Sequence, residues 1–139
     1  MFEAIRNFGQ SGAILLLGLA IGAAWIVAIV APNTSYDHLK GKAADQHVRE
    51  LLKSASDPIA VLLLVACALA ILGGAIASGV ASLIAAIGFF TNRWTLASNT
   101  SRKASEENVG KTRRILAVSL TMVFSLLAIA AAVFAILGR

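Results

Sequence analysis

The sequence has little of what soluble domains are built from. Charged residues make up 14% of its 139 residues and hydrophobic residues 58%, against about 25% and 45–50% in soluble domains. A soluble core of this size could not bury so much apolar surface, so the composition predicts an integral membrane protein. The single cysteine, Cys67, excludes an intrachain disulfide and a paired-cysteine redox site.

Charge is absent from three long stretches, residues 13–31, 58–90 and 115–137. Proton relays, ion pathways and voltage sensors need ionisable groups inside the membrane, where such groups are costly and mark function. Their absence from these stretches counts against a pump, a coupled transporter or an acid–base site buried in lipid.

Catalytic patterns are missing as well. The sequence has no Ser-His-Asp order, no Cys–His pair and no Gly-rich nucleotide fingerprint. The candidate metal ligands are Asp37, His38, Asp45 and His47. The two histidines are nine residues apart rather than at i, i+4, so these residues are interpreted as solvated loop residues. No catalytic, cofactor-binding or metal site is predicted, which favours a non-enzymatic protein.

The stretch 58–90 decides the topology. A helix that crosses a bilayer once needs about 20 residues. The 33 residues of this stretch are more than one crossing needs and fewer than two crossings need. One interpretation is a single overlong middle helix, giving three spans. The other breaks the stretch at Gly73-Gly74 into a hairpin, because two adjacent glycines are poor helix formers.

The distribution of Lys and Arg favours the hairpin. With four spans, the two polar segments, 33–57 and 91–114, lie on one side and carry ten cations, against two (Arg6 and Arg139) on the other. With three spans the counts are seven and five. The positive-inside rule therefore predicts four spans, with cytoplasmic polar loops and both termini outside.

The predicted fold is an all-α integral membrane protein, a four-span helical bundle in one domain over 1–139. The spans are about 13–31, 58–72, 75–94 and 115–137, and the polar loops are 32–57 and 95–114. Pro32-Asn33 is expected to end the first span. Apolar residues at helical spacing over 44–55 predict a short amphipathic cytoplasmic helix on the membrane surface or against the following loop. Ser56-Asp57-Pro58 then predicts a new helix start, and Ser105-Glu106-Glu107 another.

Small residues four apart predict close helix packing in the membrane. The predicted packing positions are Gly18, Gly22, Ala66, Ala70, Gly74, Ser78, Ser82, Thr121 and Ser125. Two uses of these positions stay open: contacts within the bundle, or a face for oligomerisation. The hydroxyls are expected to bond back to their own helix carbonyls at i−4.

The remaining predicted sites face the lipid headgroups. Lys111, Arg113 and Arg114 form a juxtamembrane basic cluster, each worth about 1 kcal/mol with anionic lipid. Trp25 and Trp94 are expected to be interface anchors. The expected partners are the bilayer, anionic headgroups and other membrane helices, in a homo- or hetero-oligomer, with no nucleic acid. The expected location is a bacterial inner membrane.

Three functional hypotheses follow. The first is a non-enzymatic accessory or scaffold subunit of a membrane complex. The second is a homo-oligomeric pore or holin-like protein, in which the small-residue stripes and the serines line the subunit contacts. The third is a small membrane enzyme with its site at the cytoplasmic interface, for which the candidates are His38, His47, Asn92 and Arg93.

Overall fold

The computed structural model describes residues 1–39, 42–97 and 106–137, apart from the side chains at 36, 42, 45, 93–97, 106–114 and 117. Its elements are α1 (Phe2–Trp25), the π-turn η1 (Ile26–Val30), α2 (Ala31–His38), α3 (Lys42–Leu72), α4 (Ile76–Ala97) and α5 (Glu106–Leu137). All are helical, as predicted. The described residues resume at Glu106 inside α5, so the predicted helix start at Ser105 lies outside them.

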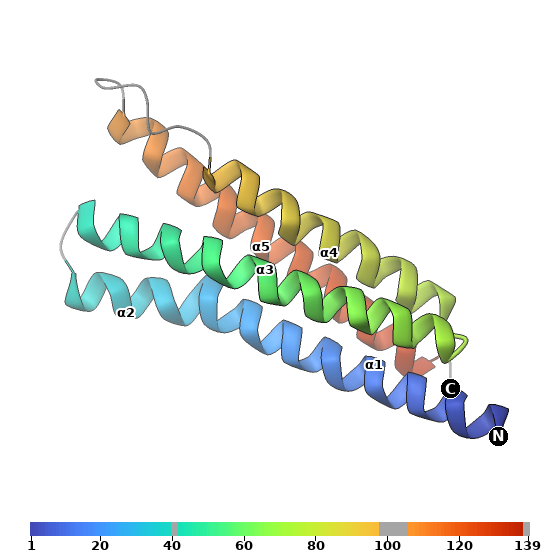
Figure 1. Ribbon diagram of the computed structural model, residues 1–139. Helices are drawn as coiled ribbons and strands as arrows, with labels where there is room; N and C mark the ends of the chain where they lie inside the picture. The colour runs from blue at the N-terminus through green and yellow to red at the C-terminus, as the bar shows by residue number, and fades with distance from the viewer. Residues whose placement is uncertain (40–41, 98–105, 138–139) are drawn as a thin grey trace.

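The helices form an antiparallel bundle of four long rods (Figure 1). α1 and α4 each pack against both α3 and α5. The start of α1, the α3–α4 turn and the end of α5 lie at one end of the bundle, which we call the turn end. The ends of α2 and α4 and the starts of α3 and α5 lie at the other, the polar end (Figure 1). This up-down-up-down order is that of a four-helix bundle.

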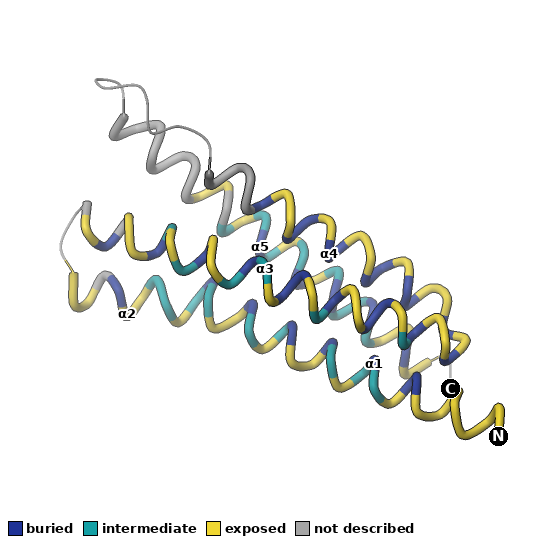
Figure 2. Tube along the Cα trace, in the orientation of Figure 1, coloured by how far each residue is buried: buried dark blue, intermediate teal, exposed yellow. Residues whose placement is uncertain are grey.

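Among the described residues, three helical stretches are long and apolar enough to cross a membrane: Phe2–Ser35, Gln46–Leu72 and Val118–Leu137. The apolar stretch of α4, Ile76–Asn92, is shorter. Burial runs along the inward faces of the helices, and the outward faces are exposed (Figure 2). Many of these exposed residues are large and apolar, such as Leu15, Val61 and Leu126. Such a surface fits a small membrane protein, because lipid covers apolar side chains at no cost.

The chain reverses at Gly73-Gly74, as the hairpin interpretation predicts, and the overlong single helix is excluded. Gly74 has a φ of 81°, a left-handed conformation that only glycine adopts at little cost. The Ala75 N–H donates to the Ala70 carbonyl at 2.8 Å, and the Gly74 N–H to that of Ile71 at 2.9 Å. These two bonds are the Schellman pattern of a helix C-terminus. Ala70 and Ala75 also share a buried cluster with Ala13, which supplies the apolar contact that often accompanies the pattern.

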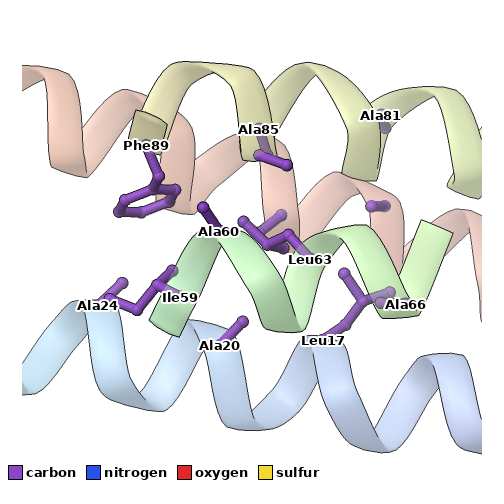
Figure 3. Close-up of a cluster of buried hydrophobic side chains, with 13 residues drawn as sticks. Leu17, Ala20, Ala24, Ile59, Ala60, Leu63, Ala66, Ala81, Ala85 and Phe89 are labelled. Atoms are coloured by element: carbon purple, nitrogen blue, oxygen red, sulfur yellow. The ribbon is translucent and has the colours of Figure 1, made fainter. Parts of the chain in front are cut away.

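The core is built from small and branched side chains of all four long helices. Leu17, Ala20 and Ala24 of α1 face Ile59, Leu63 and Ala66 of α3, with Ala81, Ala85 and Phe89 of α4 above them (Figure 3). α5 adds Ala128 and Ala131 to the same cluster. Alanines at the helix contacts let the backbones approach closely, and the larger residues fill the centre.

The first span does not end at Pro32, so that prediction is wrong. The helix continues from α1 through η1 into α2 and reaches His38. Within the π-turn the Ala31 N–H donates to the carbonyl of Ile26, five residues back. We attribute the continuation to this wider turn. It changes the backbone hydrogen bonding just before Pro32, where the proline ring would otherwise crowd the preceding helical turn. Residues 2–12, expected to precede the span, also belong to α1.

The predicted helix start at Ser56-Asp57-Pro58 is also wrong. α3 runs unbroken over 31 residues with Pro58 inside it. The Ser56 hydroxyl donates back to the Leu52 carbonyl at 2.6 Å instead of capping a new helix. Leu52 and Ile59, on the two sides of the proline, are 1% and 2% exposed. Their packing holds the helix together across the missing hydrogen bond.

The amphipathic segment over 44–55 is helical, as predicted, but it does not lie apart on the membrane surface. It is the first part of α3, and its Val48 and Leu52 pack with Val27 of η1 and Val118 of α5. The bundle therefore continues beyond the apolar band at the polar end. α3 is therefore 31 residues long, or about 46 Å, because this segment continues directly into the predicted span that begins at residue 58.

The turn geometry predicts unequal effects of alanine at the glycines. Gly74→Ala is expected to destabilise the protein by about 1–2 kcal/mol, because its backbone is left-handed. Gly73→Ala is expected to cost more, since its Cβ would lie 2.8 Å from the Gln10 nitrogen. Thermal unfolding in detergent, followed by circular dichroism, measures both. Gly18→Ala is the control, because nothing lies within 4 Å of that position. Equal melting temperatures for the three variants would contradict this account of the turn.

Candidate functional site: helix contacts inside the bundle

A close backbone contact joins α1 to the end of α3 and the α3–α4 turn. A Cβ on Gly9 would lie 2.7 Å from the Leu69 carbonyl oxygen and 2.9 Å from the Gly73 nitrogen. Beside it, the Gln10 side chain is 4% exposed and donates from Nε2 to the Gly73 carbonyl at 3.0 Å. A polar side chain from one helix thus holds the backbone of the turn between two others.

The contact between α3 and α4 uses the predicted small residues. Ala66, Ala70, Ser78 and Ser82 are all fully buried. Gly79, which the sequence analysis did not single out, sits between them, and its Cβ would lie 2.8 Å from the Ile71 Cγ1. Gly74 differs from these positions, because nothing lies within 4 Å of where its Cβ would be. Its role is the turn.

The contact between α4 and α5 combines a close approach with a buried polar pair. A Cβ on Gly88 would clash with the Phe124 ring, which lies 6.1 Å from the Phe89 ring between centroids. One turn further toward the polar end, Asn92 donates from Nδ2 to the Thr121 Oγ1 at 3.0 Å. Asn92 is fully buried and Thr121 is 2% exposed, so this bond links the two helices away from solvent.

Two of the predicted hydroxyls bond to their own helices, as expected. Ser82 donates to the Ser78 carbonyl at 2.8 Å, and Ser125 donates to the Thr121 carbonyl at 2.7 Å. Together with Ser78 and Thr121 they are buried inside one chain. None of the four is on the outer surface.

Gly18 and Gly22 lie on the outward face of α1. Both are exposed, and nothing lies within 4 Å of where their Cβ atoms would be. The inward face of α1 uses Ala20 and Ala24 instead, each 1% exposed. The structure thus separates two small-residue stripes that the sequence left equivalent.

The predicted headgroup residues are described only in part. Trp25 is 51% exposed on the outer surface, where a lipid-facing side chain would be. The side chains of Trp94, Lys111, Arg113 and Arg114 lie outside the described residues, although their backbones belong to α4 and α5.

The candidate catalytic and metal-binding side chains do not lie together in the described part of the chain. His38 and His47 are exposed, and Asn92 is bonded to Thr121 inside the bundle. Among the described residues no group of three or more His, Cys, Asp and Glu could hold a metal ion. Cys67 is a buried free thiol. What the described residues do assemble is a set of helix contacts.

Sequence reasoning missed Gly9, Gln10, Gly79 and Gly88. Gly9 and Gln10 lie before residue 13, where the predicted first span begins. Their signal is a lone glutamine between glycines, Gly9-Gln10 followed by Gly12, on a stretch that continues directly into an apolar helix. Gly88 has Ile84 and Asn92 four residues away, so a search for small residues four apart does not find it. Gly79 is four residues after Ala75, but that spacing is too common in an alanine-rich chain to single it out.

The Asn92–Thr121 bond is expected to contribute measurable coupling between α4 and α5. We expect Asn92→Ala and Thr121→Ala to be non-additive by about 0.6 kcal/mol, and at most about 1.7, the range of interhelical hydrogen bonds in membranes. A double-mutant cycle on unfolding in sodium dodecyl sulfate measures it. Asn92→Ala paired with Ser82→Ala is the control, because Ser82 bonds within its own helix. Strict additivity for Asn92 and Thr121 would refute a direct interaction.

The chain matches no protein-family model, no curated protein and no solved structure. No activity, ligand or partner can be carried over from a relative. The function is therefore inferred from the apolar helices, their contacts and the distribution of charge.

Proposed function

We propose that this protein is a non-enzymatic accessory or scaffold subunit of a membrane complex, which binds a transmembrane helix of its partner through the outward face of α1. The observation that carries the proposal is the exposed pair Gly18 and Gly22, one turn apart with nothing within 4 Å. Two glycines at this spacing leave a shallow surface that a second helix can approach closely.

The other helical glycines support this assignment by contrast. Gly9, Gly12, Gly79 and Gly88 each meet an atom of a neighbouring helix within 3 Å of a placed Cβ. The bundle therefore uses its helical glycines for close contact wherever one helix faces another. Gly18 and Gly22 would have the same use if a further helix lay against α1.

The proposed setting is a bacterial inner membrane with the polar end in the cytoplasm. The two polar segments at that end hold ten of the twelve Lys and Arg residues, which the positive-inside rule retains on the cytoplasmic side. Lys111, Arg113 and Arg114 would there meet anionic headgroups, and Trp94 would anchor the end of α4.

The two other hypotheses have less support. Of the serines expected at the subunit contacts of a pore, Ser78, Ser82 and Ser125 are buried within one chain, and Ser119 is exposed. The candidates for an interfacial enzyme site do not share a surface among the described residues, because Asn92 is buried and the histidines are exposed.

The α1 face is tested by filling it. Gly18→Leu combined with Gly22→Leu is expected to weaken association by about tenfold or more, because the new side chains hold a partner helix away. Native mass spectrometry of the protein extracted from its own membrane measures the bound fraction. Ala77→Leu, at an exposed position of α4, is the matched control. A wild-type protein that is monomeric with no partner would overturn the proposal.

The orientation is tested by thiol labelling in a Cys67→Ala background. Glu50→Cys and Glu3→Cys place reactive groups at exposed positions near the polar end and the turn end. With the polar end in the cytoplasm, an impermeant maleimide added to intact spheroplasts is expected to label position 3 and to spare position 50. Inverted vesicles are expected to give the reverse. The opposite pattern would mean that the charge asymmetry does not set the orientation.

A further inference from the structure

We propose that the α3–α4 turn stays inside the bilayer, in contact with acyl chains, and does not emerge into water at the turn end. This inference rests on the proposed membrane setting but not on the accessory role. The lipid chemistry concerned is hydrocarbon rather than headgroup, and the surface is the one formed by Leu72, Ile76 and the glycines between them.

The side chains around the turn are apolar. Leu72 and Ile76 flank it and are 62% and 69% exposed. From Pro58 to Phe90 the sequence has no charged residue and no Asn, Gln or His. A turn in water would leave these large side chains solvated, whereas hydrocarbon covers them without penalty.

Four backbone groups at the turn are paired within the protein. The N–H groups of Gly73, Gly74 and Ala75 donate to the carbonyls of Leu69, Ile71 and Ala70 at 2.8–2.9 Å. The Gly73 carbonyl accepts from the buried Gln10 side chain at 3.0 Å. Non-helical backbone at membrane depth is tolerated where it is buried in protein, and Gly73 and Ala75 are buried. Gln10 supplies a partner that a turn in water would not need from another helix.

The lengths of the helices agree with this depth. The nearest charged residues on the two arms are Asp57 and Arg93, and both belong at the membrane–water boundary of the polar end. The apolar part of α4, Ile76–Asn92, has 17 residues, which is about 25 Å at 1.5 Å per residue. A hydrocarbon core of about 30 Å therefore extends past the turn.

α1 continues where the hairpin stops. Gly9 lies against Gly73, so the seven residues of α1 before it, from Phe2, extend beyond the turn by about 10 Å. Figure 1 shows this end of α1 projecting past the turn. It carries the exposed Glu3 and Arg6. In this proposal these two polar side chains reach the membrane surface at the turn end.

Thiol accessibility in reconstituted vesicles tests the depth. In the Cys67→Ala background, Leu72→Cys and Ile76→Cys probe the turn, and Glu3→Cys and Lys53→Cys are exposed controls at the two ends. An impermeant methanethiosulfonate is added from both sides of phosphatidylcholine–phosphatidylglycerol vesicles. We expect positions 72 and 76 to react at least about tenfold more slowly than position 3, because a thiol in hydrocarbon does not form thiolate. Equal rates at 72, 76 and 3 would overturn the proposal.

A second measurement addresses the role of Gln10. Gln10→Leu removes the donor to the Gly73 carbonyl, and we expect labelling at position 72 to rise severalfold as water enters to replace it. Gln10→Asn in the same background is the matched polar control. An unchanged rate in Gln10→Leu, with the helical content unchanged by circular dichroism, would remove Gln10 from the proposal.

Failure of the turn proposal is distinguishable from failure of the membrane assignment. Resistance to alkaline carbonate extraction reports whether each variant is integral to the vesicle membrane. A carbonate-resistant protein that labels rapidly at 72 and 76 refutes the buried turn alone. A protein that carbonate removes refutes the membrane assignment, and the buried turn with it.

Discussion

The structure depends on pairing backbone N–H and C=O groups in a medium that offers them no partner. A helix does this for its own interior, so the four long helices need nothing further along most of their length. The exception is Gly73-Gly74, where the helix ends and the chain reverses. There the left-handed Gly74 closes the last turn of α3, and Gln10 reaches across from α1 to the Gly73 carbonyl. The hairpin and the position of α1 against it are therefore one feature.

The same constraint explains how two prolines fit inside continuous helices. Each removes one N–H from the backbone pairing and crowds the preceding turn. At Pro32 the chain changes to π pairing over the five residues before α2. At Pro58 the helix keeps its course, because Leu52 and Ile59 are buried on either side. Both prolines lie toward the polar end of the bundle, where the distance to water is shorter.

The parts of the fold that depend on local signals could be predicted from the sequence. Adjacent glycines predict the turn, because their effect on the backbone is confined to a few residues. The predicted helix boundaries at Pro32 and Pro58 are wrong, because a π-turn precedes Pro32 and tertiary packing holds the helix together across Pro58. The periodicity that includes Val48 and Leu52 predicts a helix, but its partners, Val27 and Val118, come from distant parts of the chain. No local sequence pattern predicts that Val27 and Val118 pack there.

The small-residue pattern shows where sequence reasoning stops for the candidate site. In an alanine-rich chain, residues four apart are frequent, and spacing cannot tell an inward stripe from an outward one. Ala20 and Ala24 are buried and Gly18 and Gly22 are exposed, although both pairs have the same spacing on one helix. The distinction comes from which face of α1 the other three helices cover. Close packing in lipid gains its stability from backbone approach rather than from apolar burial. The exposed pair Gly18 and Gly22 permits a close backbone approach that no described helix of this chain uses. For this reason the outward face of α1, rather than the more apolar faces around it, is the surface on which we expect a partner helix to bind.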